Sequence, residues 1–297
     1  MSMNDRNFMF RCEEKYNTHL DWVFNRDERV VDVTLRVHLE NEEYDYLGRS
    51  TSLQHLAVYD DKYGDEHVAM LPRKLKSLSI GSKQVTALGL SAISSINTIE
   101  ELSCRHWSIP ECEWGMLCSM RSLRHLSVAK CPQFRISALA CCENLEEATI
   151  ADALLEVQDL AEFRWDHRLR VLQLFDCRPA SDVRLSMLSN LQRLESLAVV
   201  RGAWTTEAFT DIRFLKTLKQ LSISHLPSVG DDVMPHVTQL HHLEWLGLDA
   251  TTVTDAGMPC LSRGSKLRFV SVRGTGVTAD GAKCVESQVP GLRIDVD

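Results

Sequence analysis

Cysteine, histidine and aspartate are the residue types of this sequence best suited to covalent chemistry. A nucleophile needs a base within about 3 Å and a third group that orients that base. Two pairs have suitable side chains, Cys131 with His106 and Cys177 with Asp152. Both cysteines, however, recur at one position of a repeat, where a structural role is favoured. We therefore predict no catalytic residues and a protein that is not an enzyme, with an enzyme of unknown type as the third hypothesis.

Metal-ligating residues lack the spacing that a metal site requires. The sequence contains no C-x-x-C or H-E-x-x-H segment. Cys141 and Cys142 are adjacent, so on a helix their side chains diverge by about 100°. The acidic segment 60–66 offers carboxylates without the ordered spacing of a calcium loop, and a solvated turn is predicted there. We expect neither a metal nor a cofactor.

Composition is typical of a folded protein without a membrane span. Of the 297 residues, 44% are hydrophobic and 25% are charged, and no apolar run approaches the roughly 20 residues that cross a bilayer. Residues 1–29 contain no continuous apolar segment of a signal peptide. We expect a cytoplasmic protein with reduced cysteines. A net charge of −8 and the lack of a basic stripe argue against nucleic-acid binding.

A six-residue pattern, L-x-x-L-x-L, recurs along the chain every 22 to 25 residues. Its alternation of apolar and polar residues predicts a strand with one buried face. Segments between these cores have helical spacing, as in 231–242 and 254–265. The cores begin at Val30, Leu53, Leu75, Ile99, Leu123, Leu145, Leu169, Leu194, Leu218, Leu243 and Leu267, with a shorter closing core from Leu292.

Stacked strand-and-helix units of this kind form a curved array. Neighbouring strands lie about 4.8 Å apart whereas packed helices need about 8–10 Å, so the strands take the inner side of the curve. We predict an α/β fold with a parallel concave sheet, convex helices and about 11–12 repeats. A repeat array needs its end covered. Residues 1–29 are therefore predicted to be an N-terminal cap, with apolar contacts from Trp22, Val23 and Phe24, and residues 30–297 the solenoid.

The later repeats carry a V-T-D-A-G turn at 253–257, with V-T-A-D-G at 277–281. Over about nine-tenths of its length the chain resembles leucine-rich-repeat proteins. Its later repeats resemble the cysteine-containing subtype and the bacterial repeats that contain this turn. The resemblance implies a right-handed horseshoe and a protein-binding scaffold that binds on its concave face. It also implies an alternative, a substrate-recognition adaptor of a ubiquitin-ligase-like complex, which would need a docking element not evident in residues 1–29.

One position departs from the family pattern, in which asparagine usually follows the strand. Cysteine and threonine at this position can still contact the turn backbone, threonine strongly and cysteine weakly. The loop geometry around Trp107, Ala153 and Leu226 stays open. The residues at this position are His38, Asp61, Lys83, Trp107, Cys131, Ala153, Cys177, Gly202, Leu226, Thr251 and Thr275.

The third, fifth and seventh residues of each core point to the concave face. The fifth residues are mostly small, which leaves a shallow groove, and exposed aromatic residues gather in the C-terminal half. Trp and Arg often anchor interfaces. The predicted partner-binding residues are Phe175, Val200, Trp245, Asp249, Phe269 and Arg273. An equally weighted alternative is that Trp245 and Phe269 pack together or against the C-terminal segment and only cover the sheet. The partner is an unidentified protein, and the chain is expected to be a monomer.

The eighth residues of the cores form a line of mixed charge where the strands end. A solvated edge with weak ion pairs, worth roughly 0–1 kcal/mol each, is the favoured interpretation, and a second binding surface is the alternative. These residues are His106, Lys130, Asp152, Asp176, Arg201 and His225.

Overall fold

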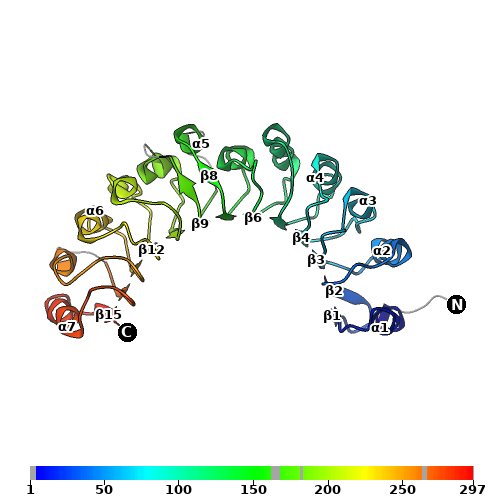
Figure 1. Cartoon of the computed structure of the whole chain (residues 1–297), viewed down its shortest axis with the longest axis horizontal. Coiled ribbons are helices and arrows are strands. Elements are labelled where there is room, and N and C mark those ends of the chain that lie inside the picture. Colours follow the sequence, from blue (N-terminus) through cyan, green and yellow to red (C-terminus); the bar gives the residue numbers. More distant parts are fainter. Residues whose placement is uncertain (1–4, 162–167, 181–182, 263–265, 297) are drawn as a thin grey trace. The chain divides into compact units, whose positions relative to one another are not determined.

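The structure is a computed structural model that describes residues 5–161, 168–180, 183–262 and 266–296. The chain divides into two compact units, Met1–Phe134 and Arg135–Asp297. In each unit the strands lie on the inner side of a curve and the helices on the outer side (Figure 1). We describe the two units separately.

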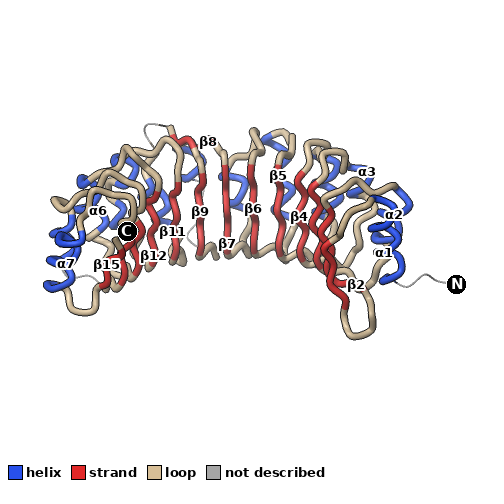
Figure 2. The backbone as a smooth tube through the Cα atoms, turned by 60° about the horizontal axis from the view of Figure 1, so that its bottom comes forward, coloured by secondary structure: helices blue, strands red, loops and turns tan. Residues whose placement is uncertain are grey.

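The first unit begins with α1 (Asp5–Tyr16) and β1 (Asp21–Phe24), and β1 pairs antiparallel with the first strand of the repeats. The repeat strands are parallel and lie side by side (Figure 2). They are β2 (Val30–Leu35), β3 (His55–Tyr59), β4 (Ser77–Gly81), β5 (Glu101–Arg105) and β6 (His125–Ala129). The helices between them are α2 (Asn41–Gly48), α3 (Asp65–Val68), α4 (Ala87–Ser94) and the 3₁₀ helix η1 (Glu111–Ser119).

The second unit continues the same pattern of parallel strands. These are β7 (Glu147–Ala151), β9 (Val171–Phe175), β11 (Ser196–Val200), β12 (Gln220–Ser224), β13 (Trp245–Gly247), β14 (Phe269–Ser271) and β15 (Arg293–Asp295). The short strands β8 (Leu154–Leu155) and β10 (Arg178–Pro179) pair with each other.

The connecting helices of the second unit are short, and most are 3₁₀. They are η2 (Ile136–Cys141), α5 (Val157–Ala161), η3 (Leu185–Asn190), η4 (Thr206–Phe209), η5 (Ile212–Phe214), η6 (Asp231–Val233), α6 (Met234–Val237), η7 (Met258–Ser262) and α7 (Ala279–Gln288). The predicted helical spacing is confirmed by burial, because Val233, Val237 and Leu240 face the core, as do Met258 and Leu261.

Every predicted core contains a strand, so the predicted fold class is confirmed. In the sheet, each core position pairs with the same core position of the neighbouring repeat. For example, Leu78 of β4 lies between Leu56 and Leu102, and Leu197 of β11 pairs with Leu221. All of these leucines are at most 5% exposed. Each repeat therefore buries its apolar positions against its neighbours, which is how a solenoid gains stability.

The N-terminal segment covers the first strand with α1. Phe8, Met9 and Cys12 are buried, whereas Val23 is 53% exposed. The Asp5 carboxylate accepts a hydrogen bond from the Val30 amide at 2.9 Å. The apolar contact thus comes mainly from α1. Trp22 and Phe24 are partly buried, and the Trp22 ring lies 5.5 Å from that of Phe10, so the prediction is wrong for Val23, which faces outward because alternate residues of a strand point to opposite sides. The boundary at residue 29 stays a prediction.

Where the strands end, one residue in each repeat from β5 to β14 has left-handed backbone geometry. His106 has φ 64° and Asp152 has φ 62°. The amide of such a residue donates to the next strand, as His106 does to the Ala129 carbonyl at 3.1 Å. L-residues adopt this geometry at a cost of roughly 1–2 kcal/mol, so the turn is maintained by its neighbours. The full set with positive φ at this position is His106, Lys130, Asp152, Asp176, Arg201, His225, Ala250 and Gly274.

The V-T-D-A-G segments join consecutive repeats. Asp231 accepts hydrogen bonds from the Thr254 amide at 2.8 Å and from its hydroxyl at 2.7 Å. Asp255 binds Thr278 of the following repeat in the same way, at 2.8 Å for both bonds. The glycine three residues after the threonine leaves space for this carboxylate, since a Cβ on Gly281 would lie 2.0 Å from the Asp255 Oδ1.

The first unit contains the same link at residues 85–89, where the sequence is V-T-A-L-G. Asp65 accepts from the Thr86 amide at 2.9 Å and from its hydroxyl at 2.5 Å. A Cβ on Gly89 would lie 2.5 Å from the Asp65 Oδ1. All three links thus share a buried valine, the Thr-x-x-Gly that follows it and an aspartate in the preceding repeat.

The cysteines are of two kinds. Cys12, Cys104, Cys112, Cys131, Cys142, Cys177, Cys260 and Cys284 are free thiols. Cys118 and Cys141 are disulfide-bonded, so the prediction that all cysteines are reduced is wrong for these two.

None of the helices in the described ranges is long and apolar enough to cross a membrane.

Candidate interaction surface

Two aromatic side chains stack on the concave face of the second unit. Trp245 and Phe269 are register partners on β13 and β14. Their rings are 6.4 Å apart between centroids and inclined by 9°, and both residues are partly exposed. Adjacent parallel strands set this spacing because their Cα atoms lie about 4.8 Å apart.

Gly247, on the same strand, leaves space for the indole ring of Trp245. A Cβ on Gly247 would lie 2.6 Å from Cη2 of Trp245, so the six-membered ring lies over this position. Ser222 of β12 lies next to Gly247 in the register. The shallow groove expected from the small fifth residues is thus partly filled by Trp245. Both stacked residues stay partly exposed.

Asp249 and Arg273 do not form a pair through their side chains. Asp249 accepts from the Ser271 hydroxyl at 2.5 Å and from the Arg273 amide at 2.9 Å. The Arg273 guanidinium lies 2.7 Å from the carboxylate of Asp295. Asp249 therefore holds the turn after β14, and Arg273 presents an exposed ion pair at this edge of the face.

Phe175 and Val200 form a separate apolar pair. They are register partners at the ends of β9 and β11, and both are partly exposed. Val200 and Trp245 lie two strands apart and four residues apart along the strand direction, which corresponds to about 16 Å. The six predicted residues thus lie on one face as three neighbouring pairs and not as one cluster.

Structural comparisons identify the architecture. An internalin from Listeria monocytogenes superposes with a TM-score of 0.54 at 15% identity, covering 91% of this chain and 90% of the internalin. The mouse RP105/MD-1 complex gives a TM-score of 0.53 at 19% identity, covering 81% of this chain and 46% of the matched chain. Both are leucine-rich-repeat proteins. This chain has a leucine-rich-repeat fold. No family model matches the sequence, and no curated protein matches it.

The leucine-rich-repeat turn is kept without its usual asparagine. Trp107 is fully buried, and its indole nitrogen donates to the Ile80 carbonyl at 3.0 Å. The Thr251 hydroxyl donates to Leu248 at 2.7 Å, and the Thr275 hydroxyl donates to Val272 at 2.6 Å. The backbone before Trp107, Ala153 and Leu226 is left-handed like that at the same position of the other repeats from β5 to β14, so the turn is retained at these three positions.

The cysteines of this leucine-rich repeat have structural contacts. The Cys131 thiol donates to the Ala129 carbonyl at 3.4 Å and the Cys177 thiol to the Phe175 carbonyl at 3.5 Å. Burial raises the pKa of each thiol to about 11. A nucleophilic cysteine needs the opposite shift. These observations favour the structural interpretation of both cysteines over the catalytic one.

The mixed-charge edge of the leucine-rich repeats contains one well-formed pair. Arg201 donates to both carboxylate oxygens of Asp176 at 2.9 and 2.8 Å, and its guanidinium lowers the pKa of Asp176. Both side chains are more than a third exposed. This agrees with the favoured interpretation of a solvated edge.

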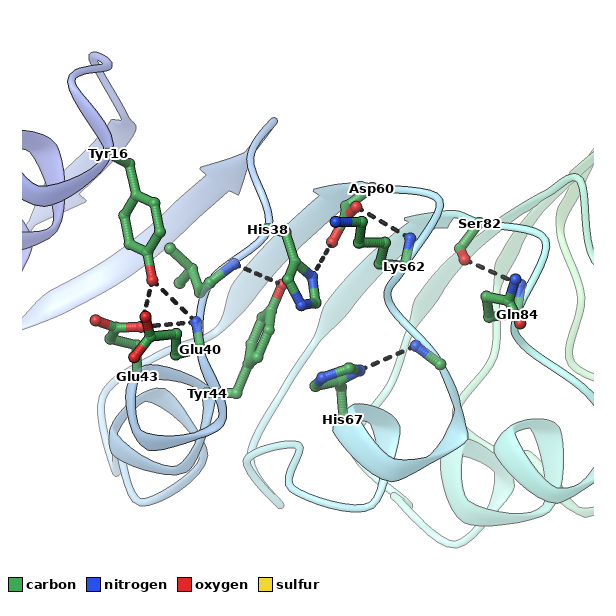
Figure 3. Close-up of polar contacts among 12 residues, drawn as sticks. Tyr16, His38, Glu40, Glu43, Tyr44, Asp60, Lys62, His67, Ser82 and Gln84 are labelled. Carbon is green, nitrogen blue, oxygen red and sulfur yellow. Dashed lines mark hydrogen bonds and ion pairs between the residues drawn. The ribbon is translucent and has the colours of Figure 1, made fainter.

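Sequence reasoning missed an aromatic and histidine cluster in the first unit. Tyr63 is 1% exposed and His67 is 4% exposed, and the His67 ring lies 4.7 Å from that of Tyr44. Nδ1 of His67 accepts from the Gly64 amide at 3.0 Å, and Asp60 binds His38 (Figure 3). The prediction of a solvated turn over residues 60–66 therefore holds for the exposed turn at Asp61 and Lys62, and it is wrong for Tyr63, which enters the core, and for Asp65, where α3 begins.

Proposed function

We propose that the second unit binds a protein partner on its concave face, with the stacked Trp245 and Phe269 as the central contact. The observation that carries this proposal is the partial exposure of two large, nearly parallel rings on neighbouring strands of the sheet. Aromatic residues dominate the binding energy of protein interfaces. The other pairs, Phe175 with Val200 and Arg273 with Asp295, would lie toward the edge of this interface.

The fold supports a role as a non-enzymatic scaffold. A curved parallel sheet offers many side chains in fixed positions, so binding requires little ordering of the protein. The matched mouse RP105 structure is itself a complex with MD-1. The ubiquitin-ligase adaptor stays a separate prediction, and no contact seen for residues 5–24 favours it, since the apolar side of α1 is buried within the chain.

The test needs a partner and two double variants. Affinity capture from the native lysate with mass spectrometry would provide partner candidates, and the dissociation constant would then be measured with purified proteins. Trp245→Ala/Phe269→Ala is expected to weaken binding by about 100-fold or more. The control, Leu88→Ala/Phe214→Ala, removes apolar side chains that are 75% and 47% exposed outside this face and should leave the affinity unchanged.

A purely structural role of Trp245 and Phe269 predicts a different result for the double variant. If the stacked rings only cover the sheet, the double variant will lower the melting temperature while the folded protein binds its partner as tightly as wild type. Equal affinity at a temperature where circular dichroism shows both proteins folded would overturn the proposal.

A cytoplasmic location also belongs to this proposal. Eight of the ten cysteines are free, which suits a reducing compartment, whereas Cys118 and Cys141 are disulfide-bonded. Fractionation of the native cells tests the location. Recovery of the protein with a cytoplasmic marker is expected, and its recovery in the secreted fraction would contradict the proposal.

A further inference from the structure

A pocket lies on the first unit where strands β2 to β5 end. Its volume is about 550 Å³, and its lining residues are Arg36, Tyr59, Asp60, Asp61, Gly81, Arg105 and His106. Tyr59, Gly81 and Arg105 are consecutive register partners on β3, β4 and β5. Arg36 follows β2 directly. Arg36 and Arg105 therefore stand on either side of Tyr59 and Gly81, about 14 Å apart at the backbone.

Gly81 has no side chain and so leaves room for the Tyr59 ring in this pocket. A Cβ on this residue would lie 3.0 Å from Cδ1 of Tyr59, so the tyrosine ring leans over the glycine. The Tyr59 hydroxyl is 3.2 Å from the Ser79 Oγ, and the Arg36 guanidinium lies 5.7 Å from the centre of the tyrosine ring. Tyr59 is 42% exposed. An aromatic ring with a polar edge thus lies between two cationic side chains.

Both arginines are available to a ligand. Arg36 and Arg105 are exposed, and across the residues that the structure describes no carboxylate pairs with either guanidinium. By contrast, Arg201 and Arg273 of the second unit have carboxylate partners. Burial, together with the charges of Lys130, Arg105 and Lys83, lowers the pKa of His106 at the rim. The local field is therefore positive in a chain whose net charge is −8.

The acidic residues of the pocket offset this field only in part. Asp60 accepts from the His38 ring at 2.6 Å and from the Lys62 amide at 3.0 Å, and its side chain is 11% exposed (Figure 3). Its carboxylate therefore faces the turn. Among the described lining residues, Asp61 is the other carboxylate and is exposed. Its single charge is smaller than the combined charge of the two arginines.

We infer that this pocket binds the carboxylate side chains of an acidic peptide segment from a partner protein. Guanidinium groups bind carboxylates in a bidentate manner with good geometric selectivity. Their separation across β2 to β5 suits two acidic side chains of one extended segment, whose backbone would cross over Tyr59. This site is independent of the proposed role of Trp245 and Phe269, because it lies on the other unit.

The test uses the full-length protein and a fluorescently labelled hexaglutamate peptide. Fluorescence anisotropy should show binding at low salt that weakens as salt is raised, because screening reduces attraction between exposed charges. Arg36→Ala/Arg105→Ala should weaken binding by about 100-fold, from the loss of two charge-assisted contacts. Tyr59→Ala, which leaves the net charge unchanged, should weaken it by a smaller factor, about threefold to tenfold.

A charge-matched control separates this pocket from a general electrostatic effect. Lys74→Ala/Lys283→Ala removes the same charge from two exposed lysines outside the pocket and should change affinity less than about twofold. Equal losses in the two double variants would overturn the proposal, as would wild type that does not bind hexaglutamate. Inorganic phosphate that binds with the same arginine dependence while hexaglutamate does not would replace the acidic peptide by a phosphate ligand.

Discussion

In the first unit Tyr59 leans over Gly81 between two arginines, whereas in the second unit Trp245 lies over Gly247 beside Phe269. In both places a glycine on the concave face makes room for an aromatic ring. The neighbouring side chains then decide the chemistry of the surface, which is cationic in one unit and aromatic in the other. A repeat backbone can therefore keep one geometry while its exposed positions specify different ligands.

The strongest test of this comparison concerns the link that both units share. Gly89→Ala and Gly281→Ala should each lower the free energy of unfolding by about 2–4 kcal/mol, because the new methyl group would collide with the Asp65 or Asp255 carboxylate. Urea unfolding followed by circular dichroism measures the effect.

Gly115→Ala is the control for these two variants. No atom lies within 4 Å of a Cβ at this position, and alanine is a better helix former than glycine by roughly 1 kcal/mol. We expect Gly115→Ala to be neutral or stabilising. If Gly281→Ala lowers the free energy of unfolding and Gly89→Ala does not, the two units do not depend on the link equally.

The two aromatic rings can be displaced by filling the space beneath them. Gly247→Ala would place a methyl group 2.6 Å from the Trp245 indole and Gly81→Ala one 3.0 Å from Tyr59. We expect each substitution to lower the free energy of unfolding by about 1–2 kcal/mol, with the larger decrease at Gly247. Tryptophan fluorescence should shift to the red in Gly247→Ala as the indole moves toward solvent.

Trp245→Phe in the same background identifies the source of this shift. The spectra of Gly247→Ala/Trp245→Phe and Trp245→Phe should coincide if Trp245 alone responds. An unchanged spectrum in Gly247→Ala would mean that the indole does not lie over this glycine.

Acidification should destabilise the protein through His67 of the first unit. Burial lowers the pKa of His67 below its ordinary value of 6.5. The unfolded chain therefore takes up a proton before the native state does, and the contribution of His67, complete above pH 6.5, falls as the pH drops below this value. Its Nδ1 accepts from the Gly64 amide, and protonation would abolish this bond.

His67→Asn is the matched variant, because its side-chain oxygen can replace the acceptor and does not titrate. Between about pH 7 and pH 5.5 the wild type should lose more unfolding free energy than His67→Asn. Parallel pH profiles for the two proteins would rule out His67 as the source of the pH dependence.

The smallest expected effect concerns the left-handed turn that follows the strands in both units. Lys130 and Ala250 have φ 54° and 52°, whereas Gly274 occupies the same position with φ 64°. Lys130→Gly and Ala250→Gly should each raise the free energy of unfolding by up to about 1 kcal/mol, since glycine adopts this geometry without steric cost.

Gly274→Ala should have the opposite sign. A Cβ there would lie 3.9 Å from its nearest neighbours, so space is available and only the backbone geometry opposes alanine. Unchanged stability in all three variants would show that the turn residues carry no strain.

Much of the fold could be predicted because apolar residues recur at the buried positions of every repeat. The alternation in each core fixed the strands, their register and the face that each side chain occupies, as for Leu78 between Leu56 and Leu102. It also placed Trp245 and Phe269 on neighbouring strands of one face. Period-two burial leaves little freedom in these assignments, since a one-residue slip would expose the whole apolar set.

Contacts between side chains of different repeats were decided by the tertiary structure. The sequence by itself determined that Asp249, Asp60 and Arg105 would lie near strand ends. It did not determine that Asp249 would bind the Arg273 backbone amide or that Asp60 would bind His38. Nor did it determine that Arg36 and Arg105 would have no carboxylate partner among the residues that the structure describes. Such choices depend on rotamers and on small gaps like that at Gly81, which arise only when neighbouring repeats are stacked.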